Sequence, residues 1–202
     1  MNHPMDAELE ALVEAAVQRR FGDRLAALDA AVAELGSRVE SLSADCPEDR
    51  ATLVAFSGDM DRLFAAFTIA SGAAAMGMQV SMFFTFWGLA ALRVKTTYQG
   101  KSLGQKMAGF MLPSGPHAVP TSRMNMGGIG PEFFKILMRQ KNVPSLPEML
   151  TMVRDLGVRI VACEMSMGVM GITREELIPG IDYGGVATYL GDAAKSKITL
   201  FV

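Results

Sequence analysis

The stretch Val158-Arg-Ile-Val-Ala-Cys-Glu-Met-Ser-Met-Gly-Val-Met-Gly171 decides how the rest of the chain is interpreted. A short run rich in β-branched residues leads to Cys163, and a segment typical of a helix start follows it. This order predicts a sulfur atom at the carboxyl edge of a parallel sheet, where open α/β sheets bind ligands. Free N–H groups at the helix start would favour thiolate over thiol. The alternative is an inert buried cysteine, because free Cys is among the most buried residue types.

Strand and helix patterns alternate outward from this stretch. Ser57 or Asp59 is expected to cap the first helix of the pattern. The alternation implies a parallel sheet that is covered by helices on both faces. The expected strands are 52–56, 80–86, 159–162, a short strand or turn at 181–183, and 197–202. The expected helices are 57–76, 132–140, 146–156, a short one at 175–178, and 185–194, with a loop and an interrupted helix within 95–112 and a loop over 113–131.

The composition of the chain excludes several classes of protein. Half of the 202 residues are hydrophobic, one fifth are charged, and the formal net charge is −2, so a broad basic face for nucleic acid is not expected. Two histidines argue against a zinc site and against a His-based triad, and neither a metal nor a cofactor is expected. Cys46 and Cys163 form no CxxC pair, which fits a reducing cytoplasm better than a disulfide framework. The N-terminus is acidic and has no signal-peptide pattern, so a cytoplasmic protein is expected.

An uncharged run from Leu63 to Leu92 is long enough to suggest a membrane span. Gly72 and Gly77 interrupt the run, and a strand-like segment begins after Met78. A helix followed by a buried strand is also continuously apolar. We therefore expect no membrane partner, with a span as the alternative.

The sequence predicts a helical arm over residues 1–46 and an α/β domain over residues 51–202. From Leu25 the apolar residues Leu25, Leu28, Val32, Leu35, Val39 and Leu42 follow the alternating spacing of a heptad seam. Leu occupies every d position and Val two of the three a positions, which favours a parallel two-stranded coiled coil and a homo-oligomer. The seam is short, and Gly36 weakens it. The alternative is an amphipathic helix that packs on its own domain.

Three smaller features carry weaker hypotheses. Cys46, in the polar link before Pro47, is expected to be an incidental exposed thiol, with a resolving partner of Cys163 as the alternative. The Gly-rich stretch from Met124 to Pro131 favours a flexible lid over an anion cradle, because it lacks both nucleotide-binding glycine patterns. Asp59 and Asp61 are explained by helix capping without a metal ion.

Three segments together resemble the DsrE/DsrF/DsrH-like family, and most of all its long-chain branch, which accompanies rhodanese and TusA-type sulfur carriers. They are Leu53–Arg62, Ala73–Leu89 with Phe-Phe-Thr-Phe-Trp-Gly at its end, and Ala162–Gly171 with Cys-Glu-Met-Ser-Met-Gly. The resemblance covers roughly residues 51–202. It implies a three-layer α/β/α sandwich with a five-stranded parallel sheet, and it implies sulfur relay with Cys163 as the sulfur-carrying residue. Some relatives have a second cysteine after the second strand, but Phe84–Gly88 contains none.

The function expected from these observations is that of a sulfurtransferase or sulfur carrier. Cys163 would hold sulfane sulfur as a persulfide or thiosulfonate and pass it to an acceptor thiol; its partners would be small sulfur species and rhodanese-like or TusA-like proteins. The N–H groups near Ser166 to Gly168 would stabilise the anion, and Trp87 and Met126 would line the pocket. The expected substrate-binding residues are Ser57, Gly58, Trp87, Met126, Ser166, Met167 and Gly168.

Two alternatives belong to other classes. One is a non-catalytic module that binds a small anion or nucleotide and uses the arm for assembly. The other is a thiol peroxidase, which needs a hydroxyl residue three positions before the cysteine and an arginine nearby. Ile160 stands at that earlier position with Arg159 beside it, so this alternative is disfavoured.

Overall fold

The computed structural model describes residues 4–45 and 47–202, with side chains described from residue 8 to 42 and from 47 onward. The chain consists of two compact units, and the boundary between them lies between residues 46 and 47. The first unit contains one long helix, α1 (Pro4–Asp45), and the second contains all the strands. Cys46 lies outside the described residues, so its two alternatives stay predictions.

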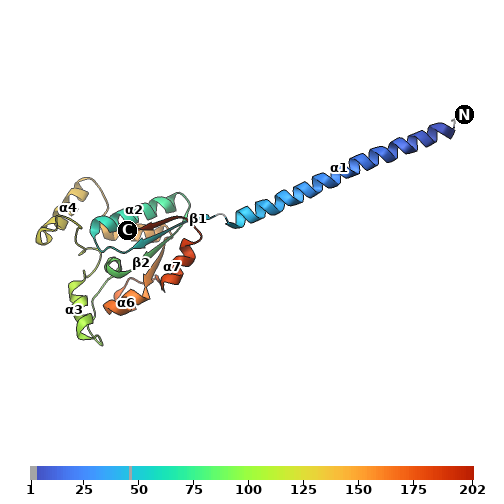
Figure 1. The fold of residues 1–202 in the computed structure, drawn as a ribbon. Coiled ribbons are helices and arrows are strands. Elements are labelled where there is room, and N and C mark those ends of the chain that lie inside the picture. The colour runs from blue at the N-terminus through green and yellow to red at the C-terminus, as the bar shows by residue number, and fades with distance from the viewer. Residues whose placement is uncertain (1–3, 46) are drawn as a thin grey trace. The chain divides into compact units, whose positions relative to one another are not determined.

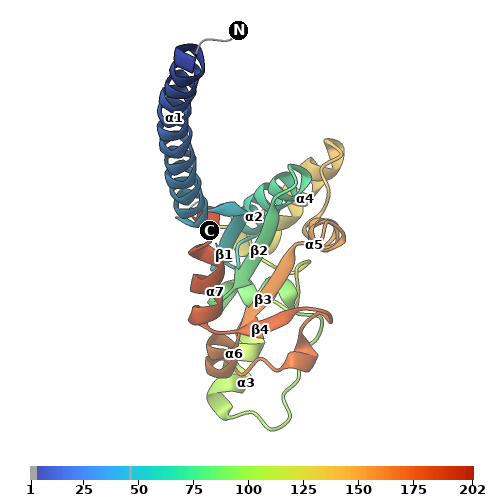
Figure 2. The same cartoon turned by 90° about the vertical axis from the view of Figure 1, so that its right-hand side faces the viewer.

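The second unit is built on a five-stranded sheet in the order β4-β3-β2-β1-β5, and every neighbouring pair is parallel. Figure 2 shows the four strands from β1 to β4 side by side. Because all strands run the same way, their carboxyl ends meet at one edge. The strands are β1 (Glu48–Ala55), β2 (Gln79–Phe84), β3 (Arg159–Cys163), β4 (Asp182–Gly184) and β5 (Ser196–Phe201).

Helices cover both faces of this sheet (Figure 1). On one face α2 (Met60–Ala75) packs against β1 and β2 and alongside α5 (Leu146–Asp155); on the other, α7 (Val186–Ala193) packs against β1, β4 and β5. The predicted three-layer α/β/α fold is therefore confirmed. The remaining helices are α3 (Leu103–Met111), α4 (Ile129–Gln140), α6 (Glu164–Met170) and the 3-10 helices η1 (Phe86–Leu92), η2 (Met126–Gly128) and η3 (Arg174–Glu176).

Alternation along the strands divides the buried side chains between two clusters. Met82, Phe84 and Ala162 point into the main core under α2 and α5, whereas their neighbours Phe83 and Cys163 belong to a smaller cluster on the other face. Strands that are buried on both faces read as continuous apolar runs, which explains the uncharged stretch in the sequence.

Several element boundaries differ from the prediction. The first strand begins at Glu48 rather than Thr52, because the Glu48 N–H donates to the carbonyl of Lys195 beside β5. The second strand ends at Phe84 rather than Phe86, because Thr85 is the N-cap residue of η1 and Phe86 begins that helix. The Gly-rich stretch predicted as loop contains η2 and the first turn of α4.

The run Leu63–Leu92 thus divides into a surface helix, a buried strand and a 3-10 helix. Among the described residues, no helix combines the length and the apolar character that a membrane crossing requires.

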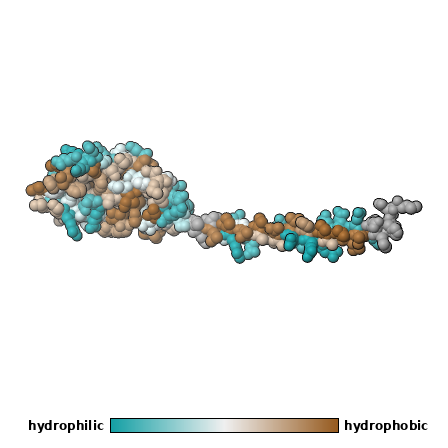
Figure 3. All heavy atoms as spheres, turned by 90° about the horizontal axis from the view of Figure 1, so that it is seen from above, coloured by the Kyte–Doolittle hydropathy of each residue, from teal (hydrophilic) through white to brown (hydrophobic). Residues whose placement is uncertain are grey.

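The helix α1 carries a row of large apolar side chains along its exposed surface. Brown and teal residues alternate along it in Figure 3. The six side chains of the predicted seam, Leu25, Leu28, Val32, Leu35, Val39 and Leu42, are 58–67% exposed within this single chain. The helix is confirmed, and its pairing in a coiled coil stays a prediction.

Candidate functional site

The ends of three neighbouring strands bring polar residues to one edge of the sheet. The register places Ala55 beside Phe84 and Phe84 beside Ala162. The residues just beyond these positions, from Phe56, Thr85 and Cys163 onward, therefore emerge together. Thr85 stays attached to the first strand, since its N–H donates to the carbonyl of Ala55 at 3.1 Å.

Cys163 is both the last residue of β3 and the N-cap residue of α6. Its side chain is 3% exposed and packs with Phe83, Val161 and the half-buried Tyr189 of α7. An N-cap side chain lies next to the unpaired N–H groups of the first helical turn. The fold therefore places the sulfur at the helix start predicted for it, but beneath a cover of side chains.

Two buried hydroxyls lie next to this thiol. The Oγ1 of Thr85 and the Oγ of Ser166 are 2.7 Å apart, and neither residue is more than 9% exposed. Each hydroxyl carries one proton, and one of these two protons is used in the bond between them. One hydroxyl is therefore free to donate to the sulfur at a time, and the pair can exchange which of them does so.

The surroundings of Cys163 have opposite effects on its acidity. Burial raises the pKa of the thiol, but the hydroxyl and N–H of Ser166, the hydroxyl of Thr85 and the N–H of Met165 lower the pKa by more, so the net shift is downward. The Cys163 side chain itself makes no cap hydrogen bond to α6. A thiol with a lowered pKa forms the nucleophilic thiolate more readily at neutral pH.

The turn that holds Thr85 is conformationally restricted. Phe86 has φ 45°, which is an unfavourable conformation for a bulky aromatic residue. Gly88 donates its N–H to the carbonyl of Phe56 at 2.9 Å, and a Cβ at this position would lie 2.1 Å from the carbonyl oxygen of Ala55. Only glycine fits there, so the turn is locked onto the end of β1 and keeps the Thr85 hydroxyl in place.

A hollow of about 190 Å³ lies beside this turn and collects three of the predicted residues. Ser57, Gly58 and Trp87 line it together with Asp59, Leu112, Pro113 and Pro120, and Cys163 is not among the lining residues. Gly58 permits the close approach, since a Cβ there would lie 2.8 Å from the carbonyl oxygen of Trp87. The Trp87 side chain is half exposed, so it forms part of an open wall.

The other predicted residues are placed less favourably. Met167 is buried in the main core, and the carbonyl of Gly168 accepts a hydrogen bond from Gln105 of α3 at 3.2 Å. Met126 is 69% exposed in η2 and lines neither the Trp87 hollow nor the cluster around Cys163. Of the two N–H groups that lower the pKa of the thiol, that of Ser166 lies within the predicted range from Ser166 to Gly168, and that of Met165 lies one residue before it.

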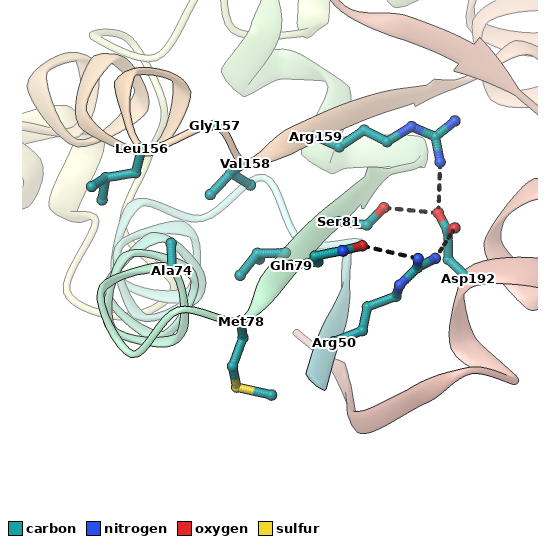
Figure 4. A pocket seen from close by; sticks show the side chains of 11 residues that line it. Arg50, Ala74, Met78, Gln79, Ser81, Leu156, Gly157, Val158, Arg159 and Asp192 are labelled. Atoms are coloured by element: carbon teal, nitrogen blue, oxygen red, sulfur yellow. Dashed lines mark hydrogen bonds and ion pairs between the residues drawn. The ribbon is translucent and has the colours of Figure 1, made fainter. Parts of the chain in front are cut away.

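The arginine beside the cysteine strand lies at the opposite edge of the sheet. Arg159 begins β3 and donates to Asp182 at 2.6 Å and to Asp192 at 2.8 Å. Figure 4 shows Arg50 and Ser81 converging on the same Asp192 at the rim of a pocket of about 420 Å³. Arg159 is thus used to hold α7 against the strands, which leaves the peroxidase alternative without its nearby arginine.

Asp59 and Asp61 act as structural residues. Asp59 is the N-cap residue of α2 and accepts from the Ser57 hydroxyl at 2.9 Å, and Asp61 binds the N–H and hydroxyl of Ser122. Within the described part of the chain, no group of three or more His, Cys, Asp and Glu residues is placed to hold a metal ion.

Sequence reasoning missed Thr85 and Tyr189. A hydroxyl residue directly after an apolar strand at the ligand-binding edge could have indicated Thr85. Tyr189 gave no signal, because its position over Cys163 depends on how α7 crosses the sheet from β4 to β5.

The α/β unit is similar in sequence to known proteins. A family model described as the DsrE/DsrF/DrsH-like family matches residues 47–201. The uncharacterized protein YrkE of Bacillus subtilis (strain 168) is 44% identical over 154 residues, which are 76% of this chain and 96% of that protein. The sulfur carrier protein DsrE2 of Allochromatium vinosum is 29% identical over 159 residues, which are 77% of this chain and 99% of that protein.

Among solved structures, the ychN protein of E. coli matches with a TM-score of 0.44 and 12% identity, over 76% of this chain and 98% of that one. The family model begins directly after the long N-terminal helix.

Proposed function

The chain belongs to the DsrE/DsrF/DrsH-like family, and from this premise we propose that it is a sulfur carrier or sulfurtransferase that holds sulfane sulfur on Cys163. The observation that carries the proposal is the position of Cys163 at the sheet edge, with donors that lower the pKa of the thiol despite its burial. The name of the relative DsrE2, a sulfur carrier protein, supports the same function.

Loading is a displacement at sulfur. The Cys163 thiolate attacks the terminal sulfur of a polysulfide, a new S–S bond forms, and the shortened polysulfide leaves with the electron pair of the broken S–S bond. With tetrathionate, the same attack forms a thiosulfonate on Cys163 and releases thiosulfate. Both steps conserve electrons, so no further oxidant is needed.

Release of the sulfur relies on the same hydrogen-bond donors around Cys163 as its capture. An acceptor thiolate attacks the outer sulfur of the persulfide, and Cys163 leaves as a thiolate. A thiol of lower pKa is the better leaving group. The hydroxyls of Thr85 and Ser166 would therefore favour release as well as capture, as relay requires.

The sulfur donor and the sulfur acceptor are proposed from the chemistry of sulfur transfer. Small sulfur species can act directly, and rhodanese-like and TusA-like proteins are the expected macromolecular partners in a reducing cytoplasm. No second thiol is expected at the β2 turn, so we infer that sulfur passes from Cys163 straight to the partner. Whether the protein turns over as an enzyme is decided by its rate with excess donor and acceptor thiol.

The test is intact-protein mass spectrometry after brief exposure of the reduced full chain to polysulfide. We expect an addition of about 32 Da, one sulfur atom, on the wild type and on Cys46→Ser, and none on Cys163→Ser. The Cys46→Ser variant is the matched control, since it removes the other cysteine. Equal loading of Cys163→Ser and the wild type would overturn the proposal and favour the non-catalytic binding module.

A further inference from the structure

The helix α1 presents an apolar surface that its own length prevents a single domain from covering. Forty-two residues at 1.5 Å each span about 63 Å. A globular unit of the size of residues 47–202 is about 40 Å across. The large exposed apolar side chains extend along most of the helix: Leu9, Leu12, Val13, Val17, Phe21, Leu25, Leu28, Val32, Leu35, Val39 and Leu42.

The pattern differs from that of a helix designed to stand alone in water. A solitary helix relies on charged side chains on all sides and on many i,i+4 pairs. In α1 the Glu34–Arg38 ion pair at 2.8 Å is of this kind, but it lies alongside a continuous apolar row. Most helical stability in proteins comes from packing of such a row. A long exposed apolar stripe indicates a missing partner.

The spacing specifies what that partner is. Between residues 25 and 42 the row follows heptad positions a and d, with Val32 and Val39 at a and Leu28 and Leu35 at d. This combination favours two parallel strands in a coiled coil. We propose that α1 pairs with α1 of a second copy of this chain, parallel and in register.

Charges flanking the seam agree with the parallel orientation. In a parallel pair each g residue faces the e residue five positions later on the other helix. Arg24 at g then faces Asp29 at e of the second copy, and the symmetric contact forms as well. In an antiparallel pair g faces g and e faces e, so Arg24 would meet only the g residues of the seam, Ala31 and Arg38, and no opposite charge.

The pairing has a consequence for the rest of the molecule. A parallel coil brings the two carboxyl ends of α1 together, so the two α/β units are attached at the same end of the coil. The dimer has twofold symmetry, and each residue of the seam meets its own copy. The family model starts at residue 47, so this assembly device is additional to the family domain.

Disulfide trapping tests the seam and its register on the full chain. In a background with Cys46→Ser and Cys163→Ser, we place one cysteine at a d position with Leu42→Cys, or on the outer f position with Ser37→Cys. Mild oxidation should convert most of the Leu42→Cys protein to a covalent dimer and leave the Ser37→Cys protein monomeric on a non-reducing gel. No dimer with Leu42→Cys, or equal trapping of both variants, would overturn the proposal.

Orientation is tested by mixing Leu25→Cys with Leu42→Cys in the same background. A parallel coil gives 25–25 and 42–42 crosslinks, whereas an antiparallel coil gives the mixed 25–42 product, and peptide mass spectrometry separates them. A predominant mixed product would overturn the parallel arrangement. These readouts involve no sulfur loading, so they stand or fall independently of the proposed function.

Solution mass provides a second measurement that does not depend on engineered cysteines. Leu35→Asp places a charge in the seam and should halve the particle mass measured by light scattering, while Ser37→Asp on the outer face should leave the mass unchanged. The near-ultraviolet spectrum checks that the α/β unit stays folded in both variants. An unchanged mass for folded Leu35→Asp would contradict the pairing.

Discussion

At the level of single residues, the acidity of the Cys163 thiol depends on two hydroxyls that are buried beneath the protein surface. Burial alone would raise the pKa of the thiol and keep it protonated. The Thr85–Ser166 pair provides a donor without a charged residue, and its own burial keeps water from competing for that donor. The thiolate is thus stabilised by the preformed arrangement of the β2 turn and the first turn of α6.

Removing these donors should make the thiol less acidic. In Ser166→Ala and Thr85→Val the lost hydroxyl no longer lowers the pKa of Cys163, so the pKa rises toward its ordinary range. Less thiolate is then present at pH 7, and alkylation by iodoacetamide slows at that pH while the rate at high pH is retained. The measurement is the pH profile of alkylation in a Cys46→Ser background.

The control for this prediction is Thr52→Val, which removes another buried threonine hydroxyl, one bonded to Ser196 at 2.7 Å. It should leave the profile unchanged. Profiles of Ser166→Ala and Thr85→Val that overlie the parent would show that the hydroxyls do not act on the sulfur.

The side chains that bury Cys163 lead to a prediction about how easily a reagent reaches the thiol. Tyr189 packs against Phe83, with ring centroids 5.8 Å apart, and belongs to the cluster around the thiol. Tyr189→Ala should open a path and speed alkylation by a similar factor at every pH, since access changes but the donors do not. Tyr98→Ala removes a tyrosine outside this cluster and should have no effect. A shifted midpoint in Tyr189→Ala, without a general increase in rate, would assign Tyr189 an electrostatic role instead.

At the level of elements, the sequence predicted the features that depend on local periodicity. The alternation of buried strands with amphipathic helices predicted the parallel sheet. The predicted bounds of the strand that leads to Cys163 differ from the observed bounds by one residue at most. The predicted end of the second strand was wrong, because Phe86 adopts a positive φ in a turn where Gly88 lies close against the end of β1. Long-range contacts of this kind leave no periodic signal in the sequence.

The segment that leads from η1 into α3 is fixed by buried charges that no sequence pattern revealed. The carboxylate of Glu176 is fully buried and accepts from Lys101 at 2.6 Å and from the N–H groups of Thr97 and Thr173. The guanidinium of Arg93, also fully buried, lies 3.7 Å away and donates to the carbonyl of Pro113 at 3.0 Å. This network ties η3 to the residues that lead into α3.

Glu176 should therefore make stability depend on pH. Burial raises the pKa of this carboxyl, but Lys101 and the two N–H donors lower the pKa by more, so it is lower in the folded chain than in the unfolded one. The stabilisation is fully present above the unfolded value of about 4.3 and is lost as the pH falls through the folded value. Glu176→Gln should cost about 3–5 kcal/mol at pH 7, because it leaves buried cations unpaired.

Urea unfolding at pH 7 and near pH 4 measures both effects. The stability difference between the wild type and Glu176→Gln should shrink at the lower pH. Glu132→Gln is a suitable control, since its carboxylate pairs with Lys135 at the surface and should contribute little. A constant difference across this pH range would contradict the assignment.

At the level of the whole molecule, the proposed sulfur chemistry and the proposed helix pairing belong to different units. The residues around Cys163 all come from residues 47–202, and the proposed seam comes from α1. Such a division explains why relatives of about the size of the α/β unit match this chain over nearly their full lengths. The proposed pairing of α1 would set the number of sites in one particle without altering the geometry of any of them.

A fragment of residues 47–202 should therefore fold and react by itself. Its sheet, both clusters of buried side chains and the Thr85–Ser166 pair are complete without the arm. We expect the fragment to unfold cooperatively, to show the same pH profile of Cys163 alkylation as the full chain, and to lose the pairing that α1 provides. Circular dichroism, alkylation kinetics and light scattering check these three points. A fragment that fails to fold, or that folds with an altered alkylation profile, would show that the arm is part of the site.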